Sequence, residues 1–191
     1  MGKILNFIER VIGFVLLILL LPLFAILYIL IIFDLKSSPI FKQQRMGLNS
    51  NPFCIYKFRT LKPNSPDNIP TDSIQSYSEY STKFGLWLRA TSIDEIPQLL
   101  NIVKGEMSFV GPRPVILNEV ELNSKRTELG IYSIRPGVTG WAQVNGRDKL
   151  EVDDKIRYDL EYLNKKSISF DVYIILLTFL KVIKKENIKG S

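Results

Sequence analysis

The sequence predicts an α/β fold: a small, mixed and helix-rich domain with a short β-hairpin, an apolar segment before it and amphipathic helices at its C-terminal end. Three observations support this prediction. Residues 11–33 contain no charged side chain, residues 40–60 have the pattern of two short strands around a turn, and residues 80–89, 150–163 and 168–183 have helical patterns. A chain of 191 residues can bury one sizeable core, so we expect one compact domain beside the apolar segment.

The apolar segment is long enough to cross a bilayer as a single helix. Its 23 residues, Val11 to Phe33, would reach about 35 Å, against a hydrocarbon core of about 30 Å. Pro22 lies in the middle, where its ring removes one backbone hydrogen bond and bends the helix. Positive charges flank both sides, so the loop charges set no clear orientation. Two readings remain open: a kinked transmembrane helix, and a re-entrant hairpin with both ends on the cytoplasmic side.

Residues 40–60 predict a hairpin whose turn contains glycine, asparagine and proline. In its second strand Lys57 and Arg59 share one face, because side chains alternate with a period of two. A solvated strand edge and a phosphate site both explain this pair. Residues 62–76, rich in proline and small polar side chains, predict a surface loop. Arg89 ends the helical pattern that follows and is a further candidate phosphate ligand.

Two helices are predicted in the last quarter of the chain. In residues 150–163 the apolar stripe includes Ile156 and Leu160, while Lys155 and Asp159 are expected on the solvent side. We interpret this amphipathic helix as structural.

Residues 168–183 are nearly all apolar but too short to span a membrane comfortably, and lysines follow them. A core helix and a helix in the membrane interface are both compatible with this pattern. The lysines favour the interface, where they would face lipid headgroups.

The composition excludes several kinds of active site. The chain has no histidine, which removes Ser-His-Asp and Cys-His arrangements and the commonest zinc ligand. Its single cysteine, Cys54, cannot form an internal disulfide. Lys and Arg number 25 against 19 Asp and Glu, and much of the excess lies beside the apolar segments. This placement favours anionic lipid or a phosphorylated substrate as partners, and no nucleic acid.

Two adjacent carboxylates, Asp94 and Glu95, precede an apolar run and have two interpretations. Ser92 with Glu95 fits a capping box, and both acids would favour the positive end of a helix dipole. Pro97 opposes a helix start at Ser92 and favours one at Asp94, because proline fits the first turn. Adjacent helical residues point about 100° apart, so the two acids cannot share one proton and would have different roles in a reaction centre.

Two later stretches strengthen the reaction-centre interpretation. Arg113 lies between two prolines, and such a rigid backbone suits bidentate phosphate recognition, although a surface turn also explains it. Residues 134–147 combine three glycines with Trp141, which predicts either a ligand-binding loop or a tight turn with a buried tryptophan. The candidate substrate ligands of that stretch are Arg135, Gln143 and Arg147. Together these residue types fit metal-assisted phosphoryl transfer.

The chain resembles the bacterial sugar transferase family, which comprises the monotopic phosphoglycosyl transferases. The resemblance rests on three ordered motifs and extends over nearly the whole chain, whose length is similar to that of the smallest members. The motifs are YKFRT at residues 56–60, SIDEIPQLLNIVKGEMSFVGPRP at residues 92–114, and RPGVTGWAQVNGR at residues 135–147.

The resemblance implies an activity and its residues. Members transfer a phosphosugar from a UDP-sugar to undecaprenyl phosphate, releasing UMP with the help of Mg2+, in the first membrane step of polysaccharide or glycoprotein glycan assembly. By position, Asp94 would be the nucleophile that forms a covalent phosphosugar intermediate, and a contact of the metal. Glu95 would be the neighbouring acid, and Arg113 would hold phosphate.

The resemblance also implies a place in the cell. Residues 1–36 would form a re-entrant helix-break-helix, and residues 37–191 a catalytic domain on the cytoplasmic face of the bacterial inner membrane. The family often breaks this helix at a Ser-Pro pair, whereas here the pair is Leu21-Pro22. Inner-membrane lipids are therefore expected partners, and homo-oligomers or association with downstream glycosyltransferases are left open.

Two competing functions remain at this stage. A glycosyltransferase that moves the sugar without its phosphate would release UDP from a UDP-sugar. A non-catalytic membrane scaffold would use Asp94 and Glu95 only for helix capping.

Overall fold

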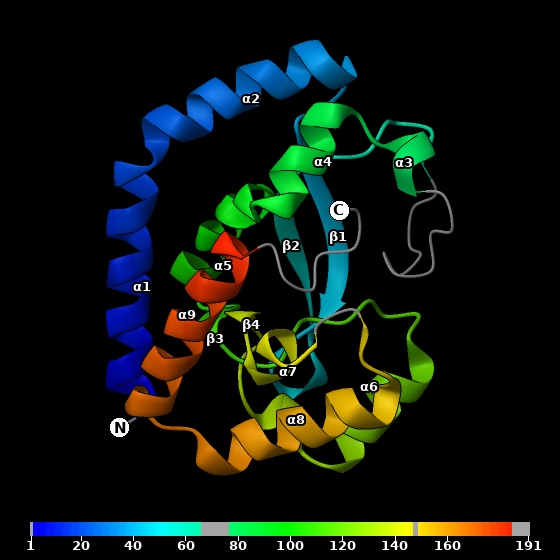
Figure 1. Cartoon of the computed structure of the whole chain (residues 1–191). Helices are drawn as coiled ribbons and strands as arrows, with labels where there is room; N and C mark the ends of the chain where they lie inside the picture. Colours follow the sequence, from blue (N-terminus) through cyan, green and yellow to red (C-terminus); the bar gives the residue numbers. More distant parts are fainter. Residues whose placement is uncertain (1, 66–76, 147–148, 185–191) are drawn as a thin grey trace. The chain divides into compact units, whose positions relative to one another are not determined.

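A computed structural model describes residues 2–65, 77–146 and 149–184 (Figure 1). Over this part of the chain the fold is mixed and helix-rich, with a short hairpin of two paired strands, as the sequence predicts. Most of the predicted surface loop at residues 62–76 lies outside the described residues.

The chain divides into two compact units. The first contains Met1–Gln43 and Cys54–Gly105, and the second contains Gln44–Phe53 and Glu106–Lys189. The division therefore falls within the hairpin, whose strands are β1 (Ile40–Met46) and β2 (Pro52–Phe58), joined through the short turn η1 (Leu48–Ser50). The predicted hairpin at residues 40–60 is confirmed.

Helices supply most of the first unit. The helix Lys83–Ala90 is capped by the residue before it, Thr82, whose hydroxyl accepts a hydrogen bond from the Gly85 backbone N–H. The helical elements are α1 (Gly2–Leu19), α2 (Leu21–Leu35), α3 (Tyr77–Tyr80), α4 (Lys83–Ala90), the 3₁₀ helix η3 (Ile93–Gln98) and α5 (Leu99–Lys104).

The apolar segment is broken into two helices that meet at 62°, visible where α1 and α2 join in Figure 1. Pro22 lies in the first turn of α2, where its missing N–H leaves no intrahelical hydrogen bond unmade. The predicted bend is thus confirmed, and proline achieves it by starting a helix. Among the described residues, no single helix is long and apolar enough to span a bilayer; α1 and α2 satisfy length and composition together, as a broken span or a re-entrant loop.

A polar contact holds each helix of this pair. On α1, Arg10 Nε donates to the carbonyl of Val103 in α5, at 2.8 Å. At the end of α2, a carboxylate oxygen of Asp34 accepts from the Thr82 hydroxyl, which caps α4, at 2.5 Å. Each bond therefore joins the apolar pair to one of the two helices that flank η3.

Apolar packing also attaches α2 to the rest of the first unit. One face of α2 contributes Leu27, Ile31 and Leu35 to a core that also contains Phe58 of β2 and Leu88 of α4. The remaining surface of α1 and α2 is rich in exposed large apolar side chains. Burying that surface in lipid would remove a large apolar area from water.

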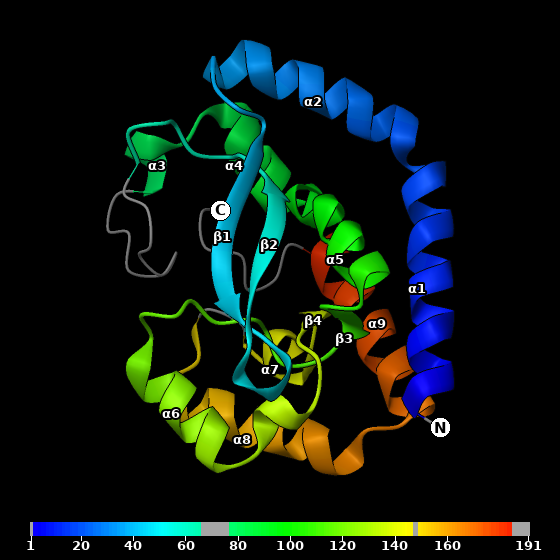
Figure 2. The same ribbon diagram turned by 180° about the vertical axis from the view of Figure 1, so that it is seen from behind.

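The second unit combines a small parallel sheet with helices, and α6 and α8 lie side by side in both views (Figures 1 and 2). In the sheet Ser108 pairs with Gly137 and Val110 with Thr139. Its elements are β3 (Ser108–Val110), α6 (Val120–Glu128), η4 (Ile131–Ser133), β4 (Gly137–Thr139), α7 (Trp141–Val144), α8 (Val152–Lys165) and α9 (Ile168–Ile183).

The predicted helix at 168–183 is confirmed as α9. Most of its large apolar side chains are exposed, while Ile174 is fully buried. Its location in the membrane interface stays a prediction.

The prediction that Asp159 of α8 faces solvent is wrong. Its side chain is 2% exposed and accepts a hydrogen bond from Nη2 of Arg126 in α6, at 2.5 Å. Burial raises the pKa of the Asp159 carboxyl, and the positive charge of Arg126 opposes that rise. Periodicity placed Ile156 in the core correctly but treats every carboxylate as a surface group, so it misses one whose cation comes from another helix.

We expect Gly137→Ala to destabilise the second unit strongly. A Cβ there would lie 2.1 Å from the backbone N of Gly111 and 2.4 Å from the carbonyl oxygen of Thr139, so the backbone must move. We expect a loss of about 3 kcal/mol in the free energy of unfolding. Gly130→Ala is the matched control, because its Cβ meets nothing within 4 Å and its φ of +69° costs about 1 kcal/mol. Denaturant unfolding measures both, and equal losses would contradict the prediction.

Candidate functional site

Asp94 and Glu95 lie in η3, between α4 and α5 of the first unit. The α-helical hydrogen bonding does not extend through Pro97, which has no N–H to donate, and α5 begins two residues later at Leu99. The two acids therefore occupy a short 3₁₀ turn rather than the first turn of a regular helix.

The predicted capping box is wrong. Ser92 has φ 56° and ψ 16°, in the left-handed region, and its side chain makes no capping hydrogen bond. Its backbone ends α4 instead, because its N–H bonds to the carbonyl of Arg89 while its own carbonyl accepts from the N–H of Glu95. A left-handed serine costs about 1 kcal/mol, and here it turns the chain from α4 into η3. This removes the simplest structural explanation for the serine and glutamate together.

Both carboxylates are buried. Asp94 and Glu95 are each 7% exposed, which is unusual for charged residues unless they are paired. A carboxylate oxygen of Glu95 accepts a hydrogen bond from Nζ of Lys57, at 2.7 Å. Of the two explanations for Lys57, a solvated strand edge is therefore wrong, since its side chain is 16% exposed and bonds to Glu95.

Asn101 fixes the strand that carries this lysine. Its side chain is fully buried, donates to the carbonyl of Cys54 at 2.7 Å, and accepts from the backbone N–H of Tyr56 at 3.2 Å. These two bonds hold β2 so that Lys57, the residue after Tyr56, lies opposite Glu95. Sequence reasoning missed Asn101, although a lone amide inside the apolar run LLNIV is a signal for a buried hydrogen-bonding side chain.

The other two candidate cations of the first unit, Arg59 and Arg89, have different surroundings. Arg59 donates from Nε to the carbonyl of Ser38 at 2.9 Å, and its guanidinium lies 5.8 Å from the ring centroid of Phe41. These contacts hold it against β1, so it does not join Lys57 at Glu95. Arg89 lies half-buried in the last turn of α4. A phosphate-binding role for either arginine stays a prediction.

The remaining candidates belong to the second unit, and two of them bind backbone carbonyls there. Arg135 donates to the carbonyl of Met107 and Gln143 to that of Val138, each at 2.9 Å. Trp141 is half-buried and donates from its indole to Glu161, which favours a packed turn over a free aromatic platform. Arg147 lies outside the described residues.

The described residues contain no group of three or more Asp, Glu, Cys or His side chains that could hold a metal ion. Asp94 and Glu95 still supply two oxygen-bearing side chains. Magnesium is commonly held by one or two carboxylates together with substrate phosphates, and the pair fits that donor set.

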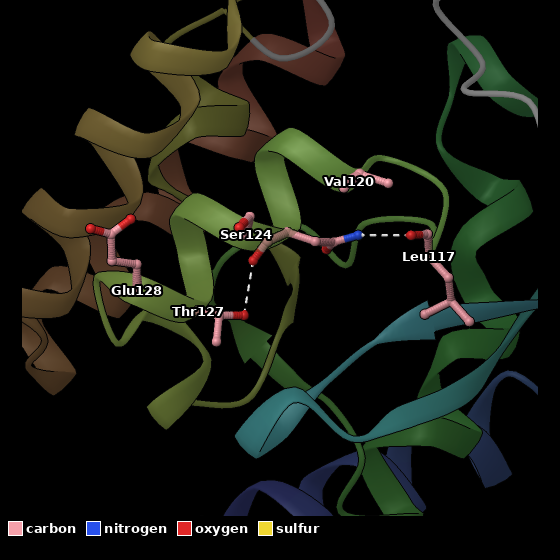
Figure 3. Close-up of a pocket in the computed structure, with 6 residues that line it drawn as sticks. Leu117, Val120, Ser124, Thr127 and Glu128 are labelled. Atoms are coloured by element: carbon pink, nitrogen blue, oxygen red, sulfur yellow. Dashed lines mark hydrogen bonds between the residues drawn. The ribbon is translucent and has the colours of Figure 1, made fainter.

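A shallow hollow in the second unit lies over α6 and contains none of these candidates (Figure 3). Its lining residues are Leu117, Val120, Asn123, Ser124, Thr127 and Glu128. With an open shape and mixed lining, it has none of the convergent charged groups that a phosphate needs.

Comparison with known proteins gives consistent matches. The model of the family described as Bacterial sugar transferase matches residues 3–185. A Bacillus subtilis protein, named as the uncharacterized sugar transferase EpsL, is 39% identical over 170 residues, covering 87% of this chain and 81% of that protein. The exopolysaccharide production protein ExoY of Sinorhizobium fredii is 36% identical over 172 residues, covering 82% of this chain and 75% of that protein.

Longer relatives match over part of their length. The UDP-glucose:undecaprenyl-phosphate glucose-1-phosphate transferase of Escherichia coli is 40% identical over 155 residues, which are 76% of this chain and 33% of that protein. This chain therefore corresponds to about a third of that enzyme.

We expect Lys57→Met to impair both stability and turnover. The change removes the ammonium from a carboxylate whose side chain is 8% exposed, at a cost of about 2 kcal/mol in the free energy of unfolding. Loss of this hydrogen bond would also make the orientation of Glu95 less well defined and lower turnover, by roughly tenfold. Unfolding and product formation with a sugar nucleotide measure the two effects.

Lys104→Met is the matched control for this change. Lys104 is exposed and donates to the hydroxyl of Tyr56, the residue before Lys57. If both variants lost activity equally, Lys57 would have no special relation to the acid pair.

Proposed function

We propose that this chain, which belongs to the bacterial sugar transferase family, transfers a phosphosugar from a UDP-sugar to undecaprenyl phosphate and releases UMP. The reaction would be the first membrane step in assembling a polysaccharide or glycoprotein glycan. The observation that carries the proposal is a buried carboxylate pair, Asp94 and Glu95, in a chain matched to this family over residues 3–185. Relatives named for transfer of glucose 1-phosphate to undecaprenyl phosphate support the reaction class.

Asp94 is the proposed nucleophile. Its carboxylate attacks the phosphorus that bears the sugar, forms an O–P bond and displaces UMP by breaking the bond to the bridging oxygen. An oxygen of undecaprenyl phosphate then attacks the same phosphorus and releases the carboxylate. A carboxylate nucleophile needs no histidine base, in keeping with a chain that has none.

Other side chains would stabilise charge around the reacting phosphates. Lys57 holds Glu95, and the carboxylates are suitable ligands for magnesium, which would neutralise charge on the diphosphate. Arg113 would bind phosphate through its planar guanidinium. Because UMP is the leaving group, the sugar stays bonded to the same phosphate group in both steps.

The same proposal includes a monotopic attachment to the cytoplasmic face of the inner membrane. Residues 1–36 would enter and leave the same leaflet, and residues 37–191 would form the catalytic part. The 62° bend between α1 and α2 and the exposed apolar surface of both helices support this arrangement.

We expect Asp94→Asn to abolish turnover while the protein still folds and binds membranes. Asparagine has nearly the same size but no nucleophilic charge, so phosphosugar transfer stops and UMP is not released. Asp154→Asn, which neutralises an exposed carboxylate in the second unit, is the control and retains activity. Incubating wild-type enzyme with a UDP-sugar and magnesium, without lipid acceptor, should add one phosphosugar mass to the peptide that contains Asp94.

Other outcomes would contradict separate parts of the proposal. Full turnover by Asp94→Asn would remove the nucleophile assignment. Release of UDP in place of UMP would indicate transfer of the sugar without its phosphate. Absence of any turnover with a panel of UDP-sugars and undecaprenyl phosphate would favour a scaffold.

The topology can be tested by cysteine labelling in a Cys54→Ser background. Cysteines introduced by Gly2→Cys and Ser37→Cys flank the bent pair. We expect both to resist a membrane-impermeant reagent added from the periplasmic side and to react after the inner membrane is opened. Labelling of one of them from the periplasm would show that the pair spans the bilayer.

A further inference from the structure

The backbone that contains Arg113 is held at six consecutive carbonyl groups. Each carbonyl from Pro112 to Leu117 accepts a hydrogen bond from another part of the second unit, in three cases from a side chain of α6. The donors in order are the Gly137 N–H at 3.0 Å, Arg126 Nη1 at 2.7 Å, Arg45 Nη1 at 3.2 Å, the Met46 N–H at 2.9 Å, and Asn123 Nδ2 at 2.8 and 3.3 Å.

Two side chains of α6 supply half of these bonds. Asn123 bonds to Ile116 and Leu117, and the hydroxyl of Tyr132 donates to its amide oxygen, which orients the amide. Arg126 bonds to Arg113 itself. Because both of these donors lie on one face of α6, this helix holds the segment along its length.

Arg126 has unusual surroundings for such a role. Its side chain is 2% exposed, and the two terminal nitrogens divide between Asp159 at 2.5 Å and the carbonyl of Arg113 at 2.7 Å. Burying two charges is costly, and apolar side chains of similar size often serve stability as well or better. Stability alone therefore does not account for an arginine here, whereas the rigid fork of a guanidinium spans both acceptors.

The hydrogen bond from Arg126 to the Arg113 carbonyl restricts one backbone torsion of Arg113. Proline at position 112 fixes its own φ, and proline at position 114 restricts Arg113 to extended conformations. The orientation of the Arg113 carbonyl then defines the ψ angle of Arg113. Holding that carbonyl fixes the base from which the Arg113 side chain extends.

We propose that Arg126, held by Asp159, is a positioning residue for Arg113 in phosphate binding. This inference rests on the proposed role of Arg113 as a phosphate ligand. A guanidinium that starts from one fixed direction loses less conformational freedom when it binds a diphosphate, so the pair strengthens binding without touching substrate. Its loss raises the KM for the UDP-sugar.

A double-mutant cycle tests the proposal. The first change is the double variant Arg126→Met with Asp159→Leu, which removes both buried charges and keeps the volume filled. The second is Arg113→Ala. We expect the double variant to lower kcat/KM for the UDP-sugar about tenfold when Arg113 is present and less than about twofold when it is alanine, because it acts through Arg113.

A matched control removes another ion pair between the same helices. Lys125 of α6 and Asp153 of α8 are 2.7 Å apart at the surface, and no hydrogen bond joins this lysine to Arg113. We expect Lys125→Gln with Asp153→Asn to keep kcat/KM within about twofold of the wild type. If the apolar double variant fails to fold, Arg126→Gln with Asp159→Asn enters the cycle in its place.

The outcomes separate this inference from the proposed function. If Arg113→Ala leaves the KM for the UDP-sugar unchanged, the phosphate-binding role of Arg113 is wrong. If Arg113→Ala impairs binding but the loss from the double variant is the same in both backgrounds, Arg126 is structural and the positioning role is overturned. A tenfold loss in the surface control would also overturn it.

Discussion

The burial of Asp94 and Glu95 is the constraint around which the first unit is organised. Two carboxylates cannot be withdrawn from water without compensation, and the ammonium of Lys57 supplies it for Glu95. That lysine is useful only if β2 holds one register, which Asn101 fixes by bonding the strand on both sides of Ile55. The local geometry of the acid pair therefore depends on a strand that is distant from it in sequence and on α5, which directly follows η3.

The second unit uses buried charge in a similar way. Arg126 and Asp159 form an ion pair inside the protein, and the same guanidinium holds the backbone of Arg113. In both units a charged group is removed from solvent and given a fixed direction. Such fixed dipoles and charges are what phosphoryl transfer needs, because positioning and charge neutralisation supply most of its catalysis.

Features set by local pattern could be predicted from the sequence. The hairpin, the amphipathic α8, the apolar α9 and the bend at Pro22 all follow from side-chain period or proline chemistry. The acid pair was noticed as two adjacent carboxylates, and its interpretation as a reaction centre came from the resemblance to the bacterial sugar transferase family. Ser92 was misassigned because a serine three residues before a glutamate predicts a capping box and does not reveal a left-handed backbone. Asp159 was misassigned because its ion pair is with another helix, distant in sequence. Asn101 and Arg126 were missed for the same reason, since their hydrogen bonds reach residues far along the chain.

The apolar helix pair and the acid pair share one physical support. Leu27, Ile31 and Leu35 of α2 pack in the core that contains Leu88 of α4, so α2 is a structural part of the first unit. Arg10 and Asp34 then fix the pair to α5 and α4, the helices on either side of η3. The apolar helix pair therefore cannot move far without also moving the turn that carries the acids, which suits the proposed action on a lipid phosphate. The proposed membrane attachment and the placement of the proposed nucleophile thus depend on the same packing arrangement.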